Sequence, residues 1–173
     1  MMLIRPATQA DVPAIASIHV DSWRATYHGM VPDAVLDELS YAEHEDRWQL
    51  RVQEDAASIT LVAEGDDGAI LGFVIGGKER TGDPIYDAEL YAIYLDPTRL
   101  RHGTGTQLTR GLARALHARG FHSLLVWVLA ANPARHFYVA LGAQYVREAT
   151  ITIGGVELPE YAYGWPTLDT LAA

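Results

Sequence analysis

The stretch AELYAIYLDPTRLRHGTGT, residues 88–106, decides the fold. Its first half is rich in aliphatic and aromatic side chains, which predicts a strand over Glu89–Leu95 that ends at Asp96-Pro97. Its second half carries two glycines at the start of a helical pattern that runs over Gly103–Arg119. A glycine turn between a strand and a helix brings backbone N–H groups and the positive end of the helix dipole together. This arrangement favours binding of an anion such as a phosphate.

Two known nucleotide-binding motifs do not fit this turn. No Gly-Lys-Ser/Thr follows the glycines, which excludes a P-loop, and residues 103–108 lack the third glycine of a dinucleotide-binding fingerprint. Taken alone, the turn therefore supports either a pyrophosphate site of another kind or an ordinary tight connection between a strand and a helix.

Outward from this stretch, helical and strand patterns follow one another along the whole chain. A capping-box-like Thr8–Asp11 precedes a helix to about His28, a short helix starts at Asn132-Pro133 and stops at Gly142, and Gly154-Gly155 joins two closing strands. Hairpins combined with a strand–helix–strand crossover indicate an α/β or α+β domain on a mixed sheet. The other predicted elements are a short apolar run at Met2–Arg5, one or two helices over Asp33–Leu39 and Tyr41–Glu54, and strands at Ile59–Glu64, Ala69–Gly76, Ser123–Leu129, Gln144–Ile153 and Val156–Trp165.

Length and composition indicate one domain over residues 1–173, large enough to bury a core without disulfide or metal staples. The chain has no cysteine, which excludes thiol nucleophiles, thiolate zinc sites and iron–sulfur clusters. Arg5 and Pro6 stand where a secretory peptide has its apolar core, and the longest apolar stretch, Leu124–Ala131, is far shorter than the ~20 residues of a membrane span. We expect a cytoplasmic protein with no membrane partner.

The charges are distributed unevenly. A net charge of −9 argues against a general nucleic-acid partner, since phosphate contacts need a basic face. Between Thr98 and Arg147, however, there are seven arginines and no acidic residue. We expect this part to face an anion and the acidic remainder to attract a cation, although excess acid also serves solubility.

With its flanks, the glycine turn resembles the acyl-CoA motif of the GNAT superfamily of N-acetyltransferases. Asn132–Gly142, with Phe137-Tyr138 inside it, resembles a helix motif of that family, and Ile4–Thr8 with Asp11 resembles its opening. These matches follow the family's order over nearly the whole chain. One departure is Leu100, because members usually carry Gln or Arg three residues before the first glycine, and we expect Arg99 or Arg101 to substitute.

The resemblance implies a mixed, mostly antiparallel central sheet of about six to seven strands that splays open between its two middle strands and is flanked by about four helices. The pantetheine arm of acetyl-CoA would lie in the opening and hydrogen-bond to the main chain like an added strand. By the same resemblance the cofactor-binding residues are Ile93, Tyr94 and Leu95 along the arm, Asn132 at its amide, and Arg101, His102, Gly103, Thr104, Gly105 and Thr106 around the pyrophosphate. Ile93 and Leu95 would also serve as core residues, and Asn132 as a helix cap.

Glu89 and Tyr138 are the candidate catalytic residues. An amine must lose a proton before or during attack on a thioester, and Glu89 would take it directly or through a water. The alternatives are another carboxylate or water alone, with Glu89 a solvent-facing strand residue. Tyr138 would donate to the departing CoA thiolate without a charge having to be buried, or would be a core aromatic.

Trp23, Tyr27 and His28 end the first helix, where this family usually lines the acceptor site. Trp23 also fits the buried stripe of that helix, and we give core packing more weight for it. The seven histidines show no pairing typical of a metal site, so no metal is predicted.

These observations predict an N-acetyltransferase that transfers the acetyl group of acetyl-CoA directly to a primary amine, with a cationic small-molecule or peptide acceptor. The alternatives are transfer of a longer acyl group, transfer to a hydroxyl, and a CoA-binding sensor without turnover. Tyr161, Tyr163 and Trp165 put aromatics on one face of the last strand, which indicates either a homodimer surface or core.

Overall fold

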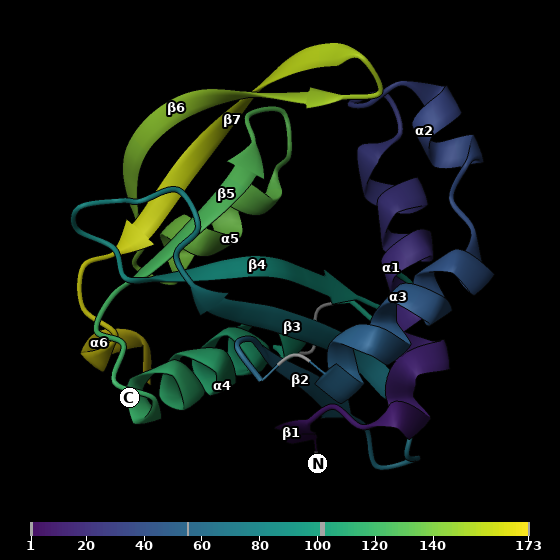
Figure 1. Cartoon of the computed structure of the whole chain (residues 1–173), viewed down its shortest axis with the longest axis horizontal. Coiled ribbons are helices and arrows are strands. Elements are labelled where there is room, and N and C mark those ends of the chain that lie inside the picture. Colours follow the sequence, from purple (N-terminus) through teal and green to yellow (C-terminus); the bar gives the residue numbers. More distant parts are fainter. Residues whose placement is uncertain (1, 55, 101–102, 173) are drawn as a thin grey trace.

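A computed structural model describes residues 2–54, 56–100 and 103–172, which form a seven-stranded sheet with helices against both faces (Figure 1). The strand order is β1-β2-β3-β4-β5-β7-β6, and neighbouring strands are antiparallel except for the parallel pair β4 and β5. In chain order the strands are β1 (Leu3–Pro6), β2 (Ile59–Glu64), β3 (Ile70–Lys78), β4 (Ala88–Leu95), β5 (Leu124–Leu129), β6 (Gln144–Ile153) and β7 (Val156–Trp165). The mixed sheet expected from the sequence is confirmed.

Six α-helices accompany the sheet within the described residues. They are α1 (Val12–Tyr27), preceded by a 3-10 turn η1 (Gln9–Asp11), then α2 (Asp33–Asp37), α3 (Tyr41–Glu54), α4 (Thr104–Ala118), α5 (Ala134–Ala140) and α6 (Asp169–Ala172). The four longest helices match the expected number, while α2 and α6 are single turns. The sequence analysis did not predict α6, because four residues are too few to show helical periodicity. In this part of the chain no helix has both the length and the apolar character needed to cross a membrane.

Alternation along β3 separates two cores on opposite faces of the sheet. Val74 faces the core that contains α4, whose Leu108, Leu112 and Leu116 are fully buried there. Phe73 and Ile75, on either side of Val74, face the second core, which α1 and α3 cover. Because successive side chains of a strand point to opposite faces, every second residue of a strand belongs to the same face of the sheet.

The sheet is splayed open at its centre. Strands β4 and β5 pair at only three positions, from Ala88↔Leu124 to Leu90↔Val126. Beyond them β4 continues to Leu95 and β5 to Leu129 without pairing to each other. The second half of β4 therefore presents an unpaired backbone edge towards the opening, as the resemblance implied.

The closing hairpin of β6 and β7 packs its aromatic face into the core. Gly154 and Gly155 form its two-residue turn with φ values of +58° and +78°, which suit a hairpin turn of the primed type. Tyr163 and Trp165 are buried against the α4 side of the sheet, and Tyr161 packs beside them. The aromatic face therefore belongs to the core, which was one of the two explanations for it.

Candidate active site

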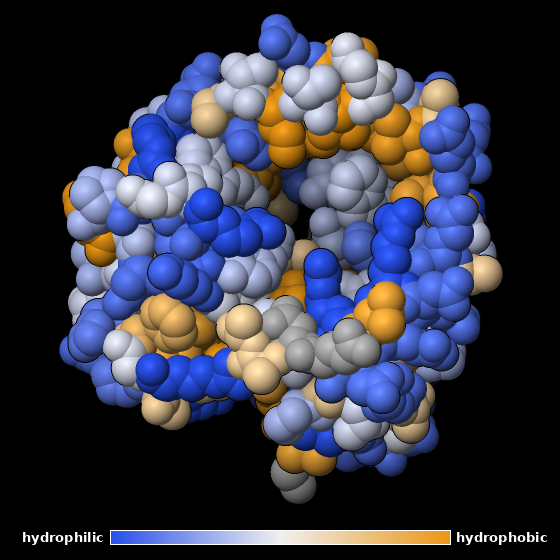
Figure 2. All heavy atoms as spheres, viewed as in Figure 1, coloured by the Kyte–Doolittle hydropathy of each residue, from blue (hydrophilic) through white to orange (hydrophobic). Residues whose placement is uncertain are grey.

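A cleft of about 1430 Å³ follows the opening between β4 and β5 and continues between α1 and the β6–β7 hairpin. Figure 2 shows this side of the molecule hollowed near its centre. Most of the residues predicted for cofactor, acceptor and catalysis line this cleft, including Trp23, Tyr94 and Tyr138. The structure thus brings together residues that lie more than a hundred positions apart in the chain.

The two glycines at the start of α4 are required for different reasons. Gly103 precedes α4 in a left-handed conformation with φ of +76°, which other residues rarely adopt. Gly105 is buried where α4 meets α5, and a Cβ at this position would lie 3.2 Å from Cζ of Phe137. Side chains at either position would therefore disturb the start of α4.

The start of α4 carries hydrogen-bond donors that the described residues leave without partners. Thr104 is 2% exposed, and its Oγ1 has no hydrogen-bond partner there. The N–H groups of the first helical turn have no intrahelical acceptor, and Thr106 lies half-buried in that turn. A pyrophosphate accepts such hydrogen bonds, so these residues fit the phosphate part of CoA. The predicted contacts Arg101 and His102 lie outside the described residues.

The unpaired edge of β4 is suited to an extended ligand. The side chains of Ile93 and Leu95 pack towards the α4 core, whereas Tyr94 packs towards the α1 core. The Leu95 carbonyl accepts a hydrogen bond from Ser22 Oγ at 2.7 Å. The side chains of this segment pack into the two cores, so the unpaired backbone is what this edge leaves available to an extended ligand.

A hydrogen-bonded network joins α1, β4 and the start of α5. Trp23 Nε1 donates to the Tyr94 hydroxyl at 3.0 Å, and the Tyr27 hydroxyl bonds to both Tyr94 and Asn132. Asn132 is buried, and its Oδ1 accepts the N–H of Ala134 at 2.9 Å, so it caps α5 as predicted. Burial raises the pKa of Tyr27 and Tyr94, which keeps both phenols neutral.

The three predicted acceptor residues separate in the structure. Trp23 and Tyr27 line the cleft and also pack in a small cluster with Leu36 and Leu129. His28 follows α1, is exposed, and is not among the residues that line the cleft. No group of three or more histidine and carboxylate side chains suited to a metal ion occurs within the described ranges.

Tyr138 lies at the cleft on the α4 side of the sheet. It is 5% exposed and makes edge-to-face contacts with the rings of Phe137 and Trp165, at centroid distances of 5.3 and 6.3 Å. Burial raises its pKa well above the usual value, so the phenol stays protonated and can donate a hydrogen bond.

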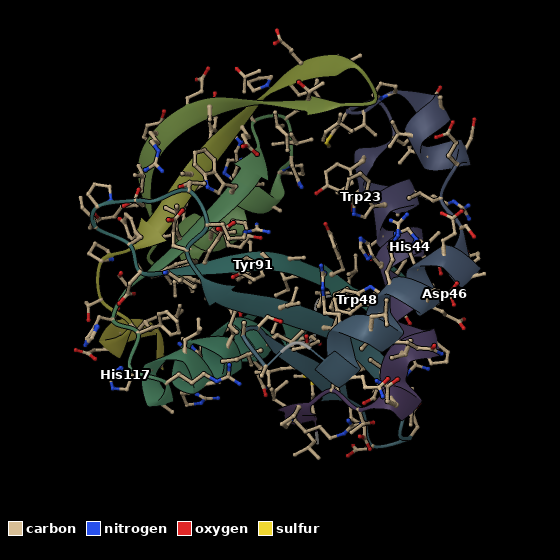
Figure 3. All side chains as sticks on the ribbon, viewed as in Figure 1. Trp23, His44, Asp46, Trp48, Tyr91 and His117 are labelled. Atoms are coloured by element: carbon tan, nitrogen blue, oxygen red, sulfur yellow. The ribbon has the colours of Figure 1, made fainter. Side chains whose placement is uncertain are left out.

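Glu89 lies on the opposite face of the sheet and is held by an arginine that the sequence analysis did not single out. Its side chain is 3% exposed, while that of Arg80 is 59% exposed. Arg80 Nη2 donates to Oε1 at 2.6 Å, and Arg80 Nε and backbone N donate to Oε2 at 3.2 Å each. Arg80 also stacks on Tyr91 at 4.0 Å from the ring centroid. Figure 3 shows Tyr91 on β4 and Trp23 on α1, at two borders of the cleft.

Strands β5, β6 and β7 supply further cleft residues that the sequence analysis did not find. Arg147 pairs with Asp83 and lies over the Trp127 ring at 5.1 Å. Glu160 lines the same wall. The signal for Glu160 was present in the sequence as a carboxylate within the alternating pattern Leu158-x-Glu160-x-Ala162.

The described arginines between Thr98 and Arg147 do not gather at one mouth of the cleft, which corrects the expected separation of charge. Arg114 and Arg119 extend from α4 to the carbonyls of Ala172 and Ala56. Arg99 pairs with Asp67 and Asp96, and Arg147 lies in the half of the cleft expected to take the acceptor. Sequence clustering failed here because helix and strand geometry points neighbouring residues in different directions.

Comparison with known proteins agrees with this geometry. Residues 83–151 match the family model of the FR47-like proteins. The chain is 41% identical over 171 residues to an uncharacterized N-acetyltransferase, YuaI, of Bacillus subtilis, covering 99% of this chain and 96% of that one. The chain belongs to the GNAT superfamily of N-acetyltransferases.

Solved structures of this superfamily have the same fold. A PaiA N-acetyltransferase from Thermoplasma acidophilum in complex with coenzyme A superposes with a TM-score of 0.74 at 19% identity, over 95% of this chain and 98% of that one. YncA, a putative acetyltransferase from Salmonella typhimurium with its cofactor acetyl-CoA, gives 0.71 at 22% identity, over 99% and 96%. The present chain is a GNAT-type N-acetyltransferase with a splayed seven-stranded sheet.

Proposed function

We propose that the protein transfers the acetyl group of acetyl-CoA to a primary amine, with both substrates bound in the cleft at once. The observation that carries this proposal is the opening between β4 and β5, which joins the two faces of the sheet. Tyr138 lies on one face, and Glu89 and Glu160 lie on the other. A thioester in the opening would meet an amine from the carboxylate face, and its sulfur would leave towards the phenol.

The protein would hold acetyl-CoA mainly through its own backbone groups. The start of α4, with the unpartnered Thr104 hydroxyl, supports pyrophosphate binding by residues 101–106. The unpaired edge at Ile93–Leu95 supports pantetheine binding, with Asn132 at the far side of the opening. The bound cofactor supplies an activated thioester, and these contacts fix its place relative to the amine.

Tyr138 and Glu89 take different parts in the proposed reaction. The neutral phenol donates a hydrogen bond to the thiolate as the C–S bond breaks. Glu89 is fixed by Arg80 through both of its oxygens, so we assign it an electrostatic role beside the path of the proton rather than direct contact with the amine. Because the chain has no cysteine, direct transfer is the simplest route.

A thiol-release assay with acetyl-CoA tests this function. The panel contains simple alkylamines and aralkylamines, aminoglycosides, amino acids and peptides, and mass spectrometry identifies each acetylated product. We expect free CoA to appear together with an N-acetyl product for at least one cationic amine. Binding of CoA without thiol release from any amine would instead favour the sensor alternative.

A further inference from the structure

Glu160 is a carboxylate placed in an apolar row. On its strand, Leu158 and Ala162 face the same side of the sheet as Glu160. Its direct partners across the neighbouring strands are Leu129 on β5 and Ala149 on β6. Directly paired residues have their Cβ atoms about 4.5–5.5 Å apart, so the nearest side chains on both neighbouring strands are apolar.

Nothing in the described part of the chain neutralises Glu160. The two arginines of this wall are already paired, Arg80 with Glu89 and Arg147 with Asp83. The Glu160 side chain makes no ion pair and accepts no hydrogen bond from the described residues. Burial raises its pKa, and the negative charge of Glu89 raises it further. A half-buried carboxylate without a partner costs stability, so its presence on the cleft wall calls for a cation from outside the chain.

The surroundings of Glu160 indicate what carries that cation. Leu129, Ile151 and Ile153 line the same stretch of cleft, so the ligand has an apolar body. Trp127 lies one strand away, and its Nε1–H is buried without a hydrogen-bond partner in the described structure. The wall therefore combines an apolar surface, one free carboxylate and one free donor, which fits a molecule with a polar head and an apolar tail.

We propose that Glu160 binds the ammonium group of the acceptor, an amine with an apolar substituent, and then takes its proton. This inference rests on the proposed acetyl transfer. The ammonium nitrogen loses one proton to Glu160 and attacks the thioester carbonyl, so that a C–N bond forms and the C–S bond breaks. The nitrogen loses a second proton as the amide forms. One of the two protons ends on the CoA sulfur, and the other leaves Glu160 for solvent.

Two acceptors of nearly equal shape test this assignment. At neutral pH, 2-phenylethylamine is a cation, whereas O-benzylhydroxylamine, with oxygen in place of one CH₂, is neutral and has no proton to lose before attack. We expect Glu160→Gln to lower kcat/KM for 2-phenylethylamine by about 100-fold, the usual size of a lost general base, and to change the neutral probe little. The KM for acetyl-CoA should stay the same.

The matched control is Glu157→Gln, on the same strand but exposed and on the opposite face. It should leave the kinetics of both probes unchanged. Glu160→Gln should unfold at an equal or higher temperature than the natural chain, because it removes an unpaired, half-buried charge. A clear loss of thermal stability would mean a structural role and would overturn the assignment, as would equal losses with both probes.

Calorimetry of the two probes with the CoA-bound enzyme separates this inference from the proposed function. The natural chain could bind 2-phenylethylamine more tightly than the neutral probe, lose this preference in Glu160→Gln, and yet release no thiol with any amine. That result would support the ammonium site but would overturn acetyl transfer and the proton step that depends on it. Equal binding of both probes to the natural chain would overturn the ammonium site even if acetyl transfer were established.

Discussion

The two halves of the cleft are built in different ways. The cofactor half, as proposed here, consists mainly of backbone groups and glycines from two short segments, the end of β4 and the start of α4. The acceptor half consists of side chains from α1, β5, β6, β7 and the segment after β3. A site made of backbone groups depends on short sequence features such as glycines at fixed spacing. A site made of side chains can change its specificity with each substitution. The comparison explains why the cofactor was easier to infer than the acceptor.

The largest effect is expected in the cofactor half. Gly103→Glu places a negative side chain on a left-handed residue where phosphate must approach, so we expect acetyl-CoA affinity to fall by at least about 100-fold, as for an unpaired charge at a binding site. Calorimetry measures it, with circular dichroism to confirm folding. Gly120→Glu is the control, because Gly120 has a similar φ of +88° at the other end of α4. If both variants bind acetyl-CoA normally, the glycine turn does not hold the cofactor.

The next largest effect is expected at Tyr138, where the thioester would lie between the cofactor half and the acceptor half. Tyr138→Phe keeps the ring packing against Phe137 and Trp165 and removes only the hydroxyl. We expect kcat to fall by roughly 10- to 100-fold, the lower range for a lost proton donor, with acetyl-CoA affinity unchanged. Steady-state kinetics and calorimetry separate the two quantities. A normal kcat would show that the thiolate leaves without this phenol.

Glu89→Gln sharpens the assignment within the acceptor half. It removes a negative charge that raises the pKa of Glu160, so Glu160 should lose its proton at lower pH. We expect the rising limb of the pH–rate profile to move to lower pH and kcat to fall by about tenfold, less than for a group that itself transfers the proton. If the rising limb of the pH–rate profile disappeared in Glu89→Gln, Glu89 itself would be the general base.

The smallest effect concerns stability at His19, whose ring stacks on that of Tyr94 in the cleft wall at a centroid distance of 5.0 Å. Burial, together with smaller charge repulsion from His44, Arg51 and Arg47, lowers the pKa of His19 from 6.5 to about 4. His44 and Trp48 lie on α3 beside α1 (Figure 3), and Trp48 Nε1 donates to His19 Nδ1 at 3.2 Å. That acceptor nitrogen is lost when His19 is protonated.

Because the unfolded chain protonates His19 more readily, stability is fully present above about pH 6.5 and falls towards pH 4. The free energy of unfolding should fall by about 2 kcal/mol over this interval, as the lowered pKa implies after a discount for partial exposure to solvent. Denaturant unfolding at several pH values measures it. His19→Gln should flatten the curve over this interval. An unchanged slope would show that His19 does not set the pH dependence.

Much of the fold could be predicted because its signals are local. The bounds of β2, β6 and β7 coincide with the predicted ranges, since turn residues and alternation mark both ends of these strands. The predictions for the cofactor residues, Tyr138 and Asn132 rest on the same kind of signal. Each belongs to a motif a few residues long.

The acceptor half could not be predicted in the same way. Arg80 reaches Glu89 from the segment after β3, and Glu160 meets Leu129 and Ala149 only through strand register. These contacts depend on strand register and on the path of the chain after β3, which no local pattern reports. His28 illustrates the opposite case, because its place after the first helix predicted an acceptor residue, yet it is exposed and does not line the cleft.

The central claim is that both halves of the cleft are filled at once, so that the amine attacks the thioester directly. Initial rates measured over a grid of acetyl-CoA and amine concentrations test it most directly. The account predicts intersecting lines in a double-reciprocal plot, because both substrates must be bound before either product leaves. Parallel lines would show a covalent acetyl-enzyme and would contradict the account.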